Sequence, residues 1–177
     1  DLVGGPIKRV IVRYDPNGSL VTTHKDQGTD LGLYSGLMGW MPEDSRIPGY
    51  EAALEEAGIE IDVRYESYDA PHPNFYRLEL FDEGGQVFRL DAISTGGGMI
   101  ELRAVDGIDL RSAGDFHHAL AWLDQHPGAG FCDGFEAVAE GVSWHPAVDG
   151  GGILNIFSRE PLDQSQREKL AGCAGCR

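Results

Sequence analysis

No apolar run in the 177-residue sequence approaches the roughly 18 residues that a membrane-spanning helix needs. The longest apolar stretches have the length of β-strands. Hydrophobic residues make up 41% of the chain, which is enough to form a buried core. The sequence therefore excludes a protein built on membrane helices, and it predicts a soluble globular chain of one large domain or two small ones.

Basic residues are also scarce, because 14 Lys and Arg stand against 29 Asp and Glu and leave a net charge of -15. Binding to a phosphate backbone depends on clustered Lys and Arg that displace counterions. No such cluster is present. We therefore expect neither a nucleic acid nor a membrane as partner, and the negative charge favours solubility.

Only three cysteines are present, too few for a disulfide framework, which predicts a reducing, cytoplasmic location. Cys173 and Cys176 form a terminal CxxC. This pair is compatible with metal or cluster ligation, with redox exchange, or with an incidental pair in a frayed tail. An iron-sulfur site needs about four ligands, and Cys132 lies on a predicted helix without an arranged partner. We expect no cluster to be held by this chain alone.

Periodicity and turn signals predict an α+β fold for the first two thirds of the chain. Strands are expected at 7–14, 59–65, 75–81, 87–93 and from 101 to 103, with DEGG as a hairpin turn. One helix is expected to be capped by Thr29 or Asp30 and to end before Pro42. A second is expected at 47–58, with Gly58 just past its end.

The pattern restarts near Phe116, which predicts two domains, 1–113 and 114–177. The second should contain strands at 117–124, 142–144 and 153–157, a helix at 130–140, and a last helix capped by Asp163 and ending near Ala171. This βαββα order resembles a degenerate form of the small ligand-binding ACT module. The resemblance implies a small ligand-binding α+β unit.

Two glycine-punctuated stretches carry the candidate binding residues. The loop THKDQGTD lies between a predicted strand and a helix, where backbone amides point toward a bound anion such as a carboxylate. An ordinary capped loop with a solvated lysine is the alternative. The candidate contacts in and before this loop are Ser19, Lys25, Gly28, Thr29 and Asp30.

The second stretch is STGGG at 94–98. Consecutive glycines supply a turn or bulge where another backbone approaches closely. The functional interpretation is an anion-binding nest or a docking edge for a catalytic partner. Its candidate residues are Ser94, Thr95, Gly96, Gly97 and Gly98. By contrast, His72 in PHPN is expected to be a turn residue.

Together these stretches resemble the β chain, or β domain, of the iron-sulfur-dependent L-serine dehydratases. The family pattern is GS-x-x-x-TGKGHGTD, then GL-x-G-x-x-PE, then S-x-GGG. The matching residues are Gly18, Ser19, Thr23, Lys25, Gly28, Thr29, Asp30, Gly36, Leu37, Gly39, Pro42, Glu43, Ser94 and Gly96 to Gly98. The resemblance implies a mixed sheet with helices packed on it.

The resemblance also implies an α,β-elimination from a small amino acid such as L-serine, followed by loss of ammonia. In the family, a separate α chain carries the iron-sulfur cluster, which acts as a Lewis acid, and the β domain recognises the substrate. The CxxC tail is then a candidate to complete or protect the partner's cluster.

The family's histidine is replaced by Gln27, and His24 and Asp26 stand where the family has glycines. A glutamine amide does not titrate near neutral pH, so Gln27 cannot act as a general base. Either the base has moved, with His24 as the candidate, or the substrate and reaction have changed.

A non-catalytic function is the alternative, since the same β fold resembles the allosteric domain of some phosphoglycerate dehydrogenases. The chain would then bind an amino acid or an anion as a regulatory effector. The sequence starts at Asp1 and not at methionine. We expect a preceding segment, which in the family contains a serine-rich SSSHT stretch.

Overall fold

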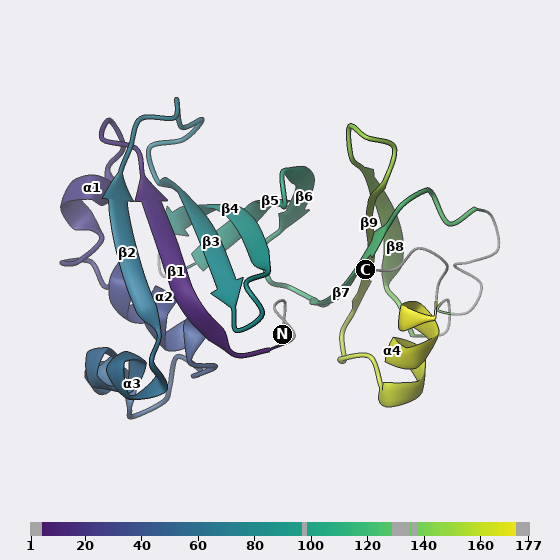
Figure 1. The fold of residues 1–177 in the computed structure, drawn as a ribbon, viewed down its shortest axis with the longest axis horizontal. Helices are drawn as coiled ribbons and strands as arrows, with labels where there is room; N and C mark the ends of the chain where they lie inside the picture. Colours follow the sequence, from purple (N-terminus) through teal and green to yellow (C-terminus); the bar gives the residue numbers. More distant parts are fainter. Residues whose placement is uncertain (1–4, 97–98, 129–134, 136–137, 173–177) are drawn as a thin grey trace. The chain divides into compact units, whose positions relative to one another are not determined.

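The computed structural model describes residues 5–96, 99–128, 135 and 138–172 (Figure 1). The chain forms two compact units, Asp1–Asp106 and Gly107–Arg177. The predicted division of the chain into the domains 1–113 and 114–177 stays a prediction. Among the described residues, no helix is both long enough and apolar enough to cross a membrane.

The larger sheet has six strands in the order β2-β1-β3-β4-β5-β6. β1 is parallel to β2, and the pairs β1–β3, β3–β4 and β4–β5 are antiparallel, so the sheet is mixed. The predicted strands and the α+β class are confirmed, while β6 was not predicted. The bounds are β1 (Ile7–Tyr14), β2 (Glu60–Tyr65), β3 (Phe75–Asp82), β4 (Val87–Gly96), β5 (Met99–Val105) and β6 (Ile108–Ser112).

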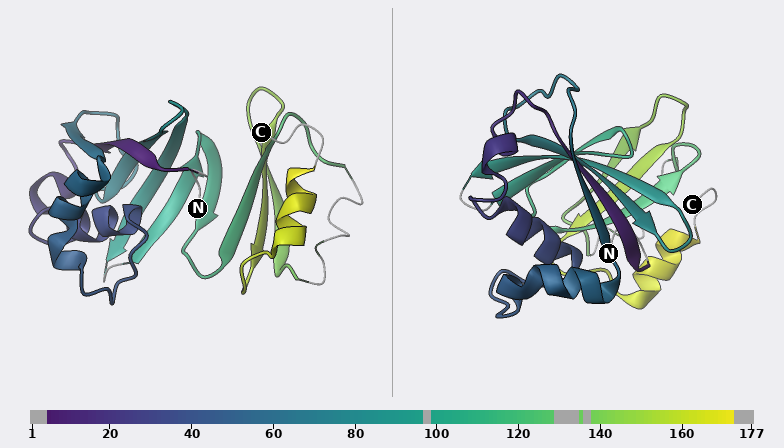
Figure 2. Two further views of the ribbon diagram at one scale, coloured as in Figure 1. Left: turned by 60° about the horizontal axis from the view of Figure 1, so that its bottom comes forward. Right: turned by 60° about the vertical axis from the view of Figure 1, so that its left-hand side comes forward.

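Helices cover one face of this sheet, as both views of Figure 2 show. They are α1 (Leu20–Thr23), α2 (Thr29–Leu37), the 3-10 helix η1 (Ile47–Gly49) and α3 (Tyr50–Ala57). Side chains at alternate positions of β1 and β3 point to the same face of the sheet. The core between sheet and helices contains Val10, Val12, Tyr14, Leu20, Tyr34, Leu54, Tyr76, Leu78, Leu80, Phe88 and Ala92.

The ends of the helices test the predicted caps. Gly58 ends α3 in the left-handed conformation at φ 66°, as predicted. The predicted cap of α2 by Thr29 or Asp30 is wrong, because Gly28 occupies the N-cap at φ 77° and no side chain bonds the helix end. The carboxylate of Asp30 lies inside and bonds His24 instead of the helix amides.

The second unit contains a three-stranded antiparallel sheet in the order β7-β9-β8. Its elements are β7 (His117–Leu123), β8 (Gly141–Pro146), β9 (Gly152–Ser158) and α4 (Gln164–Ala171). Asp163 caps α4 through a reciprocal pair of bonds with Gln166, as predicted. Most of the helix predicted at 130–140 lies outside the described residues. The ACT-like assignment stays a prediction.

Candidate functional site

The turn after β1 is held by a buried carboxylate. Asp15 accepts bonds from the backbone N–H of Asn17 at 2.9 Å, of Tyr68 at 3.1 Å and of Ala70 at 3.2 Å. These bonds, the one from Asn17 foremost, hold the pKa of Asp15 below its usual value. Asp15 therefore joins the turn to the segment that precedes β3.

Beside this turn, Asn74 connects the two glycine-punctuated stretches. The Ser19 hydroxyl bonds the side-chain oxygen of Asn74, and the Asn74 amide donates to the Ser94 carbonyl at 3.1 Å. A Cβ at Gly18 would lie 2.7 Å from the Pro73 carbonyl oxygen, so the close approach requires glycine. We call Ser19, Asn74 and Ser94 the open cluster.

An open pocket of about 400 Å³ lies at the same turn. Asp15, Asn17, Gly18, Asp69, Ala70, His72 and Pro73 line it. His72 accepts a bond from the Asn74 backbone N–H at 3.0 Å, which confirms its predicted role in the turn. With two carboxylates in its lining, the pocket suits a cationic group better than an anion.

His24 lies inside the unit and links two segments. Its Nδ1 lies 2.8 Å from both carboxylate oxygens of Asp30, and its Nε2 lies 2.8 Å from the Tyr65 hydroxyl. An ionised carboxylate only accepts hydrogen bonds, so Nδ1 carries the proton and donates the hydrogen bond to Asp30. In the neutral ring, Nε2 then accepts from Tyr65. We call Asp30, His24 and Tyr65 the relay.

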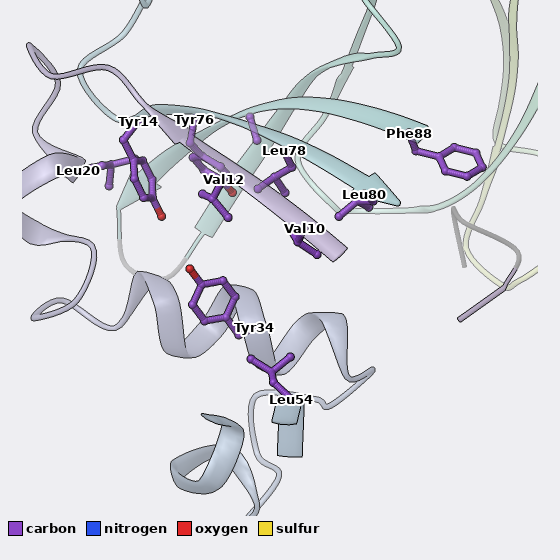
Figure 3. Close-up of a cluster of buried hydrophobic side chains, with 11 residues drawn as sticks. Val10, Val12, Tyr14, Leu20, Tyr34, Leu54, Tyr76, Leu78, Leu80 and Phe88 are labelled. Carbon is purple, nitrogen blue, oxygen red and sulfur yellow. The ribbon is translucent and has the colours of Figure 1, made fainter. Parts of the chain in front are cut away.

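Two core tyrosines, Tyr14 and Tyr34, are influenced by Asp30 of the relay. The Tyr14 ring stacks on His24 with centroids 4.8 Å apart, and its hydroxyl donates to Asp30 at 3.5 Å. Burial, followed by the charge of Asp30, raises the pKa of both Tyr14 and Tyr34. Figure 3 shows their hydroxyls directed from the sheet and from α2 into the space between them. Both phenols therefore stay protonated near neutral pH.

The outer part of the loop points the other way. Lys25, Asp26 and Gln27 are exposed, while Thr29 is half-buried. The structure thus separates His24 and Asp30, which face inward, from Lys25 and Gln27, which face solvent. The catalytic and binding roles predicted for these residues remain predictions.

In the second stretch, Thr95 and Gly96 are exposed, with Gly96 at φ 97°. Gly97, Gly98, Cys132, Cys173 and Cys176 lie outside the described residues. Across the described ranges, no group of three or more His, Cys, Asp or Glu is arranged to hold a metal ion.

Sequence reasoning missed Asn74 and Tyr65. Strand register brings Tyr65 into place, because Tyr14 pairs with Tyr65 on one side and with Tyr76 on the other. A tyrosine at the end of each of two strands is a weak signal, and it becomes informative only once the strands are known to be parallel neighbours. Asn74 has a comparable local signal, since it lies in the PHPN turn just before β3.

Two curated proteins are similar to this chain. The probable L-serine dehydratase beta chain of Bacillus subtilis strain 168 is 36% identical over 119 residues, which are 67% of this chain and 52% of that protein. The L-serine dehydratase beta chain of Peptoniphilus asaccharolyticus is 28% identical over 110 residues, which are 62% and 50% of the two chains. The chain thus spans about half the length of these relatives.

A scan against protein-family models found no match. The curated relatives confirm the resemblance drawn from the two glycine-punctuated stretches. Over about two thirds of its length, this chain is a homologue of L-serine dehydratase beta chains.

Proposed function

We propose that this chain is the β subunit of a two-component lyase that eliminates water from a small amino acid, with L-serine as the first substrate to test. The 36% identity to an L-serine dehydratase beta chain is the observation that supports the proposal most strongly. A protein called a beta chain works with another chain. We therefore propose an α subunit of the dehydratase type as the partner.

The open cluster supports a role at the substrate-facing surface. Asn74 bonds both Ser19, which precedes the first stretch, and the Ser94 carbonyl at the start of the second, and so links the two parts of the chain that carry the resemblance. The exposed ammonium group of Lys25 belongs to the loop between α1 and α2 and suits a substrate carboxylate. Together with Gly28, Thr29, Thr95 and the glycines after it, these residues are the proposed contacts to the substrate or the partner.

The iron-sulfur cluster belongs to the partner in this proposal, because the resemblance places its cysteines in the α chain. When bound there, the cluster supplies a Lewis acid for the substrate hydroxyl. Cys173 and Cys176 are proposed to approach it from this chain. In this proposal the described residues orient the substrate and take part in removing the proton from its Cα.

The pocket at the turn favours a second candidate function, an effector-binding regulatory module. Asp15 and Asp69 give its lining a negative character, so the effector would carry an ammonium group, as an amino acid does. In this alternative the chain would bind its ligand alone, without turnover and without a partner.

Assembly separates the two candidates. The purified chain is mixed anaerobically with a cluster-loaded α chain of the L-serine dehydratase type and analysed by sedimentation velocity, and L-serine binding to the chain alone is measured by calorimetry. We expect a defined heteromer, weakened by Lys25→Ala but not by Lys8→Ala, and negligible binding of L-serine to the chain alone. Tight binding of L-serine without any heteromer would favour the regulatory module.

A further inference from the structure

The relay joins residues from three segments of the chain. Asp30 lies in the first turn of α2, His24 follows α1, and Tyr65 ends β2. Each contact along the chain of atoms from the carboxylate to the phenol is 2.8 Å, a normal hydrogen-bond length. The arrangement of carboxylate, imidazole and hydroxyl is the one by which an Asp–His pair activates a serine in hydrolases.

Tyr65 is far more exposed to solvent than the other two residues of the relay. Tyr65 is 49% exposed, whereas Asp30 is 7% and His24 only 2% exposed. His24 therefore cannot reach a substrate directly, and any proton it handles must pass through the Tyr65 hydroxyl. This gradient separates a group that can contact a substrate from two groups that can only support it.

We infer that Tyr65 is the catalytic base of the elimination proposed above, with His24 and Asp30 as positioning residues that receive and stabilise its proton. The inference rests on the proposed function and deepens it. It also accounts for Gln27, because a base placed on β2 needs no titrating side chain at position 27.

The proton moves as follows. The Cα–H bond of the amino acid breaks and its proton goes to the Tyr65 oxygen, while the phenolic proton moves to Nε2 of His24. The electron pair of the broken bond forms the Cα=Cβ bond, and the β-hydroxyl leaves as hydroxide. His24 then returns its proton to Tyr65, which releases one proton to the hydroxide. One water molecule has formed, and the relay is restored.

The acidity of a phenol and the groups around His24 favour transfer of the phenolic proton from Tyr65 to His24. A phenol gives up its proton far more readily than the serine hydroxyl of hydrolases. The imidazolium formed on His24 lies against the carboxylate of Asp30, which stabilises it. Because burial raises the pKa of Tyr14 and Tyr34, neither phenol competes with Tyr65 as a proton donor to His24 near neutral pH.

Kinetics of the reconstituted complex test the base. Tyr65→Phe removes the hydroxyl at a half-exposed position, so the fold should persist. We expect kcat for pyruvate formation from L-serine to fall about a hundredfold or more, with KM changed by less than about threefold. Tyr50→Phe is the matched control, since its hydroxyl bonds Glu51 outside the relay, and it should retain the full rate.

An isotope effect distinguishes proton abstraction from a structural defect. With L-serine deuterated at Cα, Tyr65→Phe should show a larger isotope effect on kcat than the wild type, because breaking the Cα–H bond becomes rate-limiting. Asp30→Asn should show the same trend with a displaced pH profile. An unchanged isotope effect and a rate near that of Tyr50→Phe would overturn the inference and leave the proposed function standing.

Nitrogen NMR tests the relay without turnover. In the isolated chain, ¹⁵N shifts should show His24 protonated at Nδ1, with Nε2 as acceptor. Asp30→Asn should move the proton to Nε2, because an amide can donate to Nδ1. A wild-type ring protonated only at Nε2 would overturn the relay. If the wild-type complex with an active cluster makes no pyruvate, the proposed function fails, and the role of Tyr65 in the elimination fails with it.

Discussion

The relay and the open cluster differ in their access to water. In the relay, His24 and Asp30 are buried, and each has the other as its main hydrogen-bond partner. In the open cluster, Ser19 is exposed and Asn74 is half-buried, so water can replace a lost partner. An unpaired polar group is costly only where water is excluded. Removing a polar group at the buried His24 or Asp30 should therefore lower the stability of the fold, whereas the same change at Ser19 or Asn74 should have a smaller effect on stability.

Asp30→Ala should have the largest effect. The substitution leaves the buried His24 without the carboxylate that accepts the hydrogen bond from its Nδ1–H. It also removes the acceptor of the hydrogen bond from the Tyr14 hydroxyl. We expect a loss of about 2–4 kcal/mol in the free energy of unfolding, measured by urea denaturation. Asp26→Ala is the control, because that carboxylate is exposed in the same loop, and it should change stability by less than about 0.5 kcal/mol. An equal loss in the free energy of unfolding for the two variants would contradict the proposed difference between the relay and the open cluster.

Asp15→Asn should have the next largest effect. The asparagine offers one acceptor oxygen where the carboxylate offers two, so at least one of the three backbone N–H groups loses its partner. We expect the melting temperature to drop by several degrees at pH 7.

The same variant should reveal the pH dependence of Asp15. Its pKa in the folded chain lies below the ordinary 3.8, so the carboxylate stabilises the fold above that pH. This contribution is lost as pH falls through the lowered pKa. The difference in melting temperature between wild type and Asp15→Asn should therefore shrink below about pH 4. A difference that stays constant down to pH 2 would contradict this role.

Local signals predicted much of the fold. Alternation indicated β1 and the β3–β4 hairpin, Gly58 marked the end of α3, and Asp163 marked the start of α4. These features depend on residues close together in the sequence, so a pattern can identify them.

The candidate site was harder to predict, because it depends on long-range pairing. Only the parallel register of β1 and β2 places Tyr65 beside Tyr14 and within reach of His24. Asp30 was one of two predicted caps of α2, with Thr29, because its position fits the local rule, yet its carboxylate bonds His24 in the tertiary structure. The loop that carries the family resemblance was identified from sequence, and its division into a buried and an exposed side was not.

Asn74→Ala tests the open cluster, with a smaller expected effect on stability. It cuts the link between Ser19 and the Ser94 carbonyl, so the two stretches lose their fixed spacing. We expect the rate of the reconstituted complex to fall about tenfold while the melting temperature changes by only a few degrees. Gln86→Ala, in the exposed β3–β4 turn, is the control. An unchanged rate would mean that the open cluster does not face the substrate.

Gln27→His should have the smallest effect. Gln27 is exposed, so an imidazole there disturbs no packing. If Tyr65 is the base, restoring the family's histidine should change the rate with L-serine by less than about threefold. A large loss would instead indicate that Gln27 contacts a different native substrate, and a large gain would indicate that position 27 is where the base belongs.

Pyruvate formation from L-serine tests the central claim that this chain is half of an enzyme. The chain alone, a cluster-loaded α chain of the dehydratase type alone, and their mixture are assayed anaerobically with L-serine. We predict pyruvate only from the mixture, with a rate that saturates as this chain is added to a fixed amount of α chain. Turnover by this chain without the α chain, or an α chain whose activity is indifferent to its addition, would contradict the account.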